Sequence, residues 1–179
     1  MDCKILNESE RGNEFLEKIY EWTGRNKIEL LYRGTRYGSG SNEFHNKCDN
    51  QGPILILCQN EKGNIFGAYS SISWTSDNGN HAANGSFLFT LTNIHNTPPT
   101  KFPNTQNYDW AVYHCSSYGP TFGGNHDLYI CNDYLNNNSY CSLGYSYKDV
   151  LGKGNSVFSG DVNSGNFKLK ELEVFKFLN

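Results

Sequence analysis

Hydrophobic and polar positions alternate in short blocks along the chain, and this pattern predicts a mainly β protein. Residues 8–23 carry apolar side chains at helical spacing and are followed by Gly24, so they predict an amphipathic helix that ends there. The segment 52–58 (GPILILC) is a continuous apolar run, 60–64 (NEKGN) is a turn, and 65–74 (IFGAYSSISW) brings the chain back. Together these segments predict a β-hairpin.

The remaining segments are short strands separated by polar turns. Further strands are predicted at residues 28–33, 86–91, 110–115, 127–131 and 171–177. A second short helix is predicted at 42–49, so both predicted helices lie near the N-terminus. Loops are predicted at residues 76–85, 92–108 and 132–149. Many strands and few helices predict an α+β, mainly β fold: a two-sheet antiparallel β-sandwich decorated by short helices.

Composition narrows the class of protein. The chain has 179 residues, with 37% hydrophobic and 15% aromatic residues, which predicts one ordered domain with an aromatic core. The net charge of −3 comes without a basic stripe, so nucleic-acid binding is not predicted. Neither a leading apolar segment nor a long apolar run is present, and direct membrane insertion is not predicted. We expect a cytoplasmic protein whose six scattered cysteines are reduced.

The segment 116–130, SSYGPTFGGNHDLYI, contains the most concentrated candidate chemistry. A Walker loop needs a Lys and a Ser or Thr after its last glycine, and a dinucleotide loop needs a following helix. Here Gly123 and Gly124 are followed by Asn125, His126 and a predicted strand. A structural turn, in which glycine permits positive φ or passes under a large side chain, is favoured over a phosphate cradle. A backbone anion nest remains open.

His126 and Asp127 suggest a catalytic pair. In a strand, however, adjacent side chains point to opposite faces, so the two would not form a relay with each other. His126 would then need another carboxylate, such as Asp109 or Asp161. Asp127 is expected to accept hydrogen bonds from nearby backbone N–H groups.

The sequence gives only weak support for a metal site or a catalytic cysteine nucleophile. The candidate metal ligands are His114, Cys115, His126, Cys131 and Cys141. They lack CxxC or HExxH spacing, and neighbours in a strand would not face one ion, so neither a metal nor a cofactor is predicted. The cysteines at 58, 115 and 131 are interpreted as small core residues.

Aromatic residues leave one binding alternative open. Trp22, Trp74 and Trp110, with twelve tyrosines, suggest a sugar-stacking surface of the kind that lectin sandwiches use. Most of these rings are expected in the core, because the chain has few aliphatic residues to replace them.

Several segments in order resemble one family. They are LLYRGTRYGSGSNEFHNKCDNQGPILIL (30–57), GNIFGAYSSISW (63–74), SFLFTLTN (86–93), AVYHCSSYGPTFGGNHDLYI (111–130), SLGYSY (142–147) and NFKLKELEVFKF (166–177). Together they resemble a TLDc domain, the oxidation-resistance family. The resemblance begins near residue 14, which divides the chain into an N-terminal extension, residues 1–13, and a single TLDc domain, residues 14–179.

The resemblance implies the same two-sheet sandwich, the TLDc fold. Its signature positions, interpreted as mostly fold-determining, fall on Gly67, Trp74, Gly119, Pro120, Phe122, Gly123, Gly124, His126 and Asp127. The chain departs from the family pattern at Ala68 and Asn125, where relatives have or often have glycine. Both departures are mild, and Asn is the non-glycine residue that best tolerates positive φ.

The resemblance also implies a function. TLDc domains are associated with protection against oxidative stress, and several bind the cytosolic V1 sector of the vacuolar proton-pumping ATPase. The family brings no agreed catalytic set, so the first hypothesis is a non-catalytic interaction domain that regulates the pump. Through the pump it would be recruited to vacuolar or endolysosomal membranes. The alternatives are a small-molecule or redox enzyme using the His126/Asp127 region, and a carbohydrate-binding β-sandwich.

Overall fold

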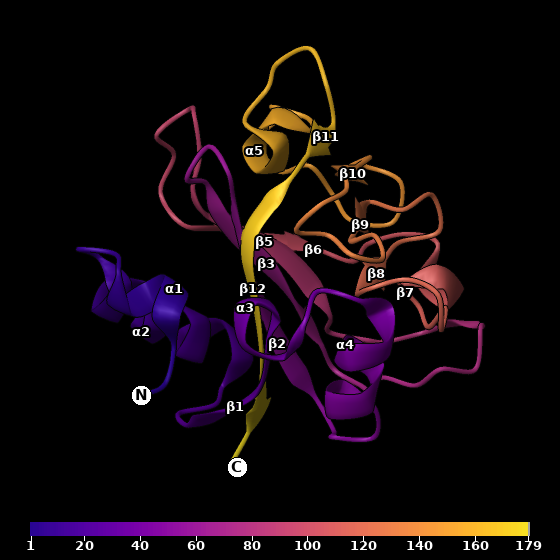
Figure 1. Ribbon diagram of the computed structural model, residues 1–179. Helices are drawn as coiled ribbons and strands as arrows, with labels where there is room; N and C mark the ends of the chain where they lie inside the picture. Colours follow the sequence, from indigo (N-terminus) through magenta and orange to yellow (C-terminus); the bar gives the residue numbers. More distant parts are fainter. Residues whose placement is uncertain (179) are drawn as a thin grey trace.

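Two six-stranded antiparallel sheets and an outer layer of helices make up the protein (Figure 1). The structure, a computed structural model, describes residues 1–178. The first sheet has the spatial order β1 (Ile28–Arg33), β12 (Leu169–Phe177), β2 (Ile54–Asn60), β3 (Ile65–Ser70), β5 (Phe87–Thr92), β6 (Thr100–Pro103). The second has the order β11 (Asn166–Phe167), β10 (Ser139–Cys141), β9 (Leu128–Tyr129), β8 (Thr121–Phe122), β7 (Val112–Tyr113), β4 (Asn80–His81). The predicted β-sandwich is confirmed.

The helices are short. They are α1 (Lys4–Asn7), α2 (Gly12–Thr23), α3 (Gly34–Tyr37), α4 (Ser41–Cys48) and α5 (Ser156–Ser159), with a 3₁₀ turn η1 (Tyr108–Trp110). Figure 1 shows α1 and α2 on one side of the first sheet and the second sheet on the other. None of the helices within residues 1–178 combines the length and apolarity needed to cross a bilayer.

The first sheet is buried on both faces, which explains the continuous apolar run in β2. Ile54, Ile56 and Cys58 belong to the core between the sheets, whereas Leu55 and Leu57 belong to the core under α1 and α2. Successive strand residues point to opposite faces, so a strand covered on both sides needs apolar residues throughout. The hairpin of β2 and β3 is confirmed by their antiparallel pairing.

The N-terminal helix is shorter than predicted. It ends as expected at Gly24, which has φ of +66° and whose N–H donates to the carbonyl of Tyr20 at 2.9 Å. It begins at Gly12 rather than residue 8, because α1 precedes it as a separate turn. A Cβ on Gly12 would lie 2.0 Å from the carbonyl oxygen of Leu6, so the two helices meet where only glycine fits.

A buried ionic network ties residues 2–5 to the first sheet. Glu173 of β12 is fully buried and accepts hydrogen bonds from the backbone of Lys4 and Ile5 and from the guanidinium of Arg33. Arg33 also contacts Asp2 at 2.7 Å. Residues 2–5 therefore pack on the same sheet as the rest of the chain, and the domain boundary at residue 14 stays a prediction.

Several predicted boundaries were wrong, two of them at the edge strands β6 and β4. The predicted loop 92–108 contains β6, an edge strand that pairs Pro103 with Phe87, and proline is tolerated at an edge. The loop 76–85 contains β4, and 132–149 contains β10. The strands predicted at 65–74, 110–115 and 127–131 shorten to β3, β7 and β9, and α5 lies late in the chain, where no helix was predicted.

Candidate functional site

The glycine-rich segment forms a hairpin between β8 and β9 in the second sheet. Phe122 pairs with Leu128, and the five residues between them make the turn. The N–H of His126 donates to the carbonyl of Gly123 at 3.1 Å, and the N–H of Gly119 donates to Ile130 at 2.9 Å. The segment thus reverses the chain without any helix N-terminus that could hold a phosphate.

Two positions in this turn require glycine for different physical reasons. Gly123 has φ of +89°, and a Cβ there would lie 1.9 Å from the carboxylate of Asp127. Gly124 lies between two aromatic rings, with a Cβ placed 2.7 Å from Trp110 and 2.9 Å from Tyr145. The turn is tight at one glycine and passes between large side chains at the next.

Asp127 binds backbone N–H groups, but not those of its own turn. Its carboxylate is fully buried and accepts hydrogen bonds at 3.0–3.1 Å from four consecutive residues of another loop. The donors are the N–H groups of Gly144, Tyr145, Ser146 and Tyr147. Burial raises the pKa of Asp127, and these hydrogen bonds oppose the rise. Asp127 holds the loop 144–147 against the hairpin.

The predicted strand 127–131 begins one residue later than expected, so neither His126 nor Asp127 lies in a strand. Both precede β9, and His126 has φ of +56°, which belongs to a turn. The Nδ1 of its ring lies 2.5 Å from the hydroxyl of Tyr140. Within residues 1–178, its side-chain hydrogen bonds include no carboxylate, and therefore neither Asp109 nor Asp161. The His–carboxylate pair that the enzyme hypothesis needs is not formed here.

His126 instead lies at the centre of a tyrosine cluster, which we call the tyrosine platform: Tyr113, Tyr118, His126, Tyr129 and Tyr140. The imidazole is nearly parallel to the rings of Tyr129 and Tyr113. The ring centroids lie 5.3 Å and 6.1 Å from that of His126, with interplanar angles of 17° and 18°. Tyr118 and Tyr140 complete the group through rings at angles to His126. All five side chains are half-buried. Desolvation in this cluster lowers the pKa of His126.

Strand alternation places this platform on the outer face of the second sheet. Val112, Leu128 and Cys141 point into the core, so their neighbours Tyr113 and Tyr129, and likewise Tyr140, point outward.

The loop that carries Tyr118 is held by α4. The Nε2 of His45 donates to the carbonyls of Cys115 and Tyr118 at 3.0 and 2.9 Å. The sequence pattern gave no signal for this role of His45, because the contact joins elements that are distant along the chain.

The other signature residues lie in the core. Gly67 of β3 leaves no room for a Cβ, which would stand 1.9 Å from the carbonyl oxygen of Ile56. Trp74 and Phe122 are fully buried, and their rings lie 5.3 Å apart. Pro120 is buried at the base of the hairpin.

Exposed aromatic residues gather beside the platform. Trp110 and Tyr145 are 44% and 38% exposed, and their parallel rings lie 6.4 Å apart on either side of Gly124. Tyr108, 53% exposed, lines a shallow hollow of about 230 Å³ together with Trp110. Trp22, in contrast, packs on Phe87 and Phe89 under the helical layer.

The cysteines do not gather into a reactive or metal-binding group. All six are free thiols. Cys58 and Cys131 are buried as predicted, whereas Cys115 is only half-buried. Burial raises the pKa of Cys3 and Cys141 to about 12.

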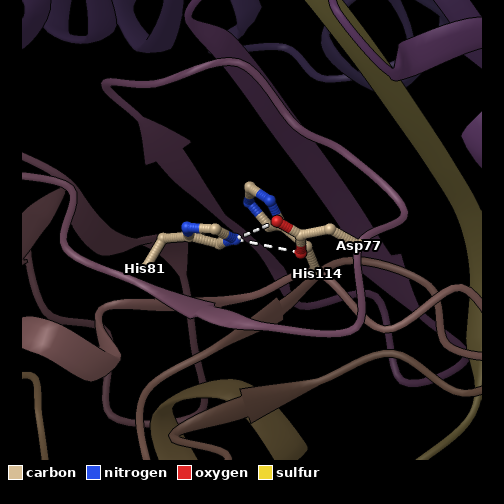
Figure 2. Close-up of side chains that lie close together, drawn as sticks. All are labelled: Asp77, His81 and His114. Atoms are coloured by element: carbon tan, nitrogen blue, oxygen red, sulfur yellow. Dashed lines mark hydrogen bonds and ion pairs between the residues drawn. The ribbon is translucent and has the colours of Figure 1, made fainter.

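The structure gives His114 partners that were not predicted. The predicted partners were the cysteines and His126, but His114 instead faces Asp77, in the loop before β4, and His81, in β4 (Figure 2). Burial lowers the pKa of His114 to about 4. The i, i+4 spacing of Asp77 and His81 was visible in the sequence, but their approach to His114 depends on the pairing of β4 with β7.

These features define a two-sheet sandwich with an outer helical layer and a glycine-rich hairpin that packs beside a cluster of half-buried tyrosines. The family model for the TLDc domain matches residues 2–178, and the chain belongs to that family. The match confirms the family resemblance over essentially the whole chain. Comparison with curated proteins gave no match.

Proposed function

We propose that this chain is a non-catalytic interaction domain that binds the cytosolic V1 sector of the vacuolar proton-pumping ATPase. It would regulate the pump in the cytoplasm, be recruited to vacuolar or endolysosomal membranes through it, and contribute to protection against oxidative stress. Membership of the TLDc family supports the choice of partner.

The tyrosine platform carries the proposal. Its rings are held by one another and by His126, so few rotamers remain to be lost on binding. Tyrosine combines a large apolar face with a hydroxyl group and is enriched in protein interfaces. The net charge of −3 favours a basic partner surface.

Binding of purified V1 sector to the immobilised chain tests this proposal. The variant Tyr113→Ser/Tyr118→Ser removes two platform rings, and Tyr108→Ser is the matched control, since Tyr108 is exposed outside the platform. Truncation of an interface tyrosine costs about 2 kcal/mol when it is a hot spot, so we expect at least a roughly 30-fold loss of affinity in the double variant. The control should bind like the wild type.

Far-UV circular dichroism and thermal melting establish that each variant is folded. Equal V1 binding by the platform variant and the control would exclude the platform as the interface. No capture of V1 by the wild-type chain, together with unchanged acidification after its deletion, would exclude the pump as the partner.

A second candidate function, carbohydrate binding, is favoured by the exposed pair of Trp110 and Tyr145 and by the adjacent hollow. Sugars stack on aromatic faces, which supply apolar contact area. A glycan-array screen of the wild type and Trp110→Ala tests it. Binding that disappears in Trp110→Ala would support this candidate, and an array without wild-type signal would exclude it.

A further inference from the structure

Asp77, His81 and His114 bring three potential metal ligands to one end of the second sheet. Figure 2 shows the carboxylate and the two imidazoles converging, and their ligand atoms all lie within 4.8 Å of one another. Asp77 precedes β4, His81 lies in it, and His114 directly follows β7. The group therefore spans two paired strands.

Backbone hydrogen bonds fix this arrangement. His81 pairs with Val112 across β4 and β7. The N–H of His114 donates to the carbonyl of Gly79 at 2.9 Å, and the N–H of Asn78 donates to the carbonyl of His114 at the same distance. The loop carrying Asp77 and His81 is thus held beside His114 without help from the side chains themselves.

His114 has an unpartnered nitrogen in a buried position. Its side chain is 1% exposed, and its Nδ1 lies 2.9 Å from the hydroxyl of Thr75. Its Nε2 is buried and makes no hydrogen bond. The imidazole of His114 packs against the rings of Trp74 and His81, with centroid distances of 4.4 Å and 4.6 Å. A buried polar atom without a protein partner is costly, and an ion or a water molecule can satisfy it.

Asp77 and His81 supply the other two ligands from the exposed side. The Nε2 of His81 lies 2.8 Å from one carboxylate oxygen of Asp77 and 3.0 Å from the other. The N–H of Gly79 donates to Asp77 Oδ1 at 2.9 Å and orients that carboxylate. Both side chains are partly exposed, at 34% for His81 and 47% for Asp77, so an ion can enter from solvent.

We propose that Asp77, His81 and His114 form a binding site for one divalent transition-metal ion, with zinc as the best fit. Two neutral imidazoles and one carboxylate are the nitrogen and oxygen ligands that zinc prefers, and three protein ligands leave a fourth position open. Binding replaces the proton that joins His81 to Asp77. Thr75 accepts the Nδ1–H of His114, which leaves the Nε2 lone pair for the metal.

The ligand atoms must shift slightly around the ion, and the pair of His81 and Asp77, now 2.8 Å apart, must separate. Zinc lies roughly 2.0–2.2 Å from such ligands, which brings neighbouring ligand atoms to roughly 3.4 Å in a tetrahedral site. The partly exposed His81 and Asp77 can turn toward the fixed His114. A bound ion would fasten the loop 76–85 to β7, next to Tyr113 of the platform. This inference does not depend on the proposed function.

Zinc titration of the purified, tag-free, chelator-treated chain tests the site by isothermal calorimetry and thermal melting. We expect one zinc per chain and a rise in melting temperature of roughly 5–10 °C at a 100-fold excess over Kd. Cobalt should give the visible absorption typical of a tetrahedral site. Magnesium, which requires octahedral oxygen coordination, should give neither response.

Matched variants assign the ligands. His81→Gln and Asp77→Asn should each lower zinc affinity at least tenfold and abolish the thermal shift. His95→Gln, a half-exposed histidine that contacts Ser156 instead, should behave like the wild type. Equal melting temperatures in chelator would show that His81→Gln is folded, since its side chain is largely outside the core.

Cys115 follows His114 and is the one half-buried thiol among the six, so every titration is repeated in a Cys115→Ser background. Retained binding in that background supports the Asp–His–His site. Absence of stoichiometric zinc binding, equal binding by His81→Gln and His95→Gln, or loss of binding with Cys115→Ser alone would overturn it.

Discussion

Replacement of Asp127 tests whether the most suggestive part of the sequence is structural or catalytic. The Asp127→Ala variant removes the acceptor for four backbone N–H groups of the loop 144–147. Gly144 and Tyr145 are exposed, so water can replace the carboxylate there. Ser146 and Tyr147 are buried, and their N–H groups would be left without an acceptor.

The cost follows from these two buried donors. Each buried unsatisfied N–H costs about 1–3 kcal/mol, so we expect Asp127→Ala to lower the free energy of unfolding by about 4 kcal/mol. For a domain of this size, that corresponds to a fall in melting temperature of roughly 8–16 °C. Asp127→Asn keeps one oxygen that can take the position of Oδ2, which accepts from all four donors, so it should cost about 1–2 kcal/mol.

Urea denaturation and thermal melting measure both variants against Asp109→Ala, an exposed aspartate whose loss should change stability by less than about 0.5 kcal/mol. Hydrogen exchange should show loss of protection first at Ser146 and Tyr147. A cost below about 1 kcal/mol for Asp127→Ala would refute this reasoning. A fully stable Asp127→Ala variant that no longer binds V1 would instead make Asp127 an interface residue.

Three further predictions concern the same region. Gly123→Val should cost roughly 3 kcal/mol or more in urea denaturation, because the residue has φ of +89° and its Cβ would overlap Asp127; a variant that melts with the wild type would contradict this. Native alkylation followed by peptide mapping should modify Cys115 first, since the other thiols are buried; faster reaction elsewhere would be inconsistent with the fold. The pKa of His126 lies below its ordinary value in the folded state, so its contribution to stability is present above the unfolded pKa and is lost as pH falls through the folded value. The wild type should therefore lose stability relative to His126→Phe as pH falls below the ordinary histidine pKa of about 6.5, and an NMR titration giving His126 a raised pKa would reverse that sign.

The sequence predicted the first sheet better than the second because the two sheets depend on different signals. β2 and β3 are long, apolar and joined by a tight turn, so local pattern was enough to predict them. Five of the six strands of the second sheet, all except β10, have two residues each, and the sequence pattern cannot set the ends of a strand that short. β6 was missed because its proline indicates a loop unless the strand is known to lie at an edge.

The part of the tyrosine platform that lies on strands was predictable, because side chains alternate between the two faces of a strand. Once strands were predicted near 112 and 128, alternation required Tyr113 to face away from Val112 and Tyr129 to face away from Leu128. The sequence did not show which face was outward, because Tyr113 could equally have faced the core in place of Val112. The second sheet settles this choice by packing Val112 and Leu128 against the first. His126, which stacks on these tyrosines, has φ of +56° in the turn before β9, and a period-two pattern contains no information about that turn.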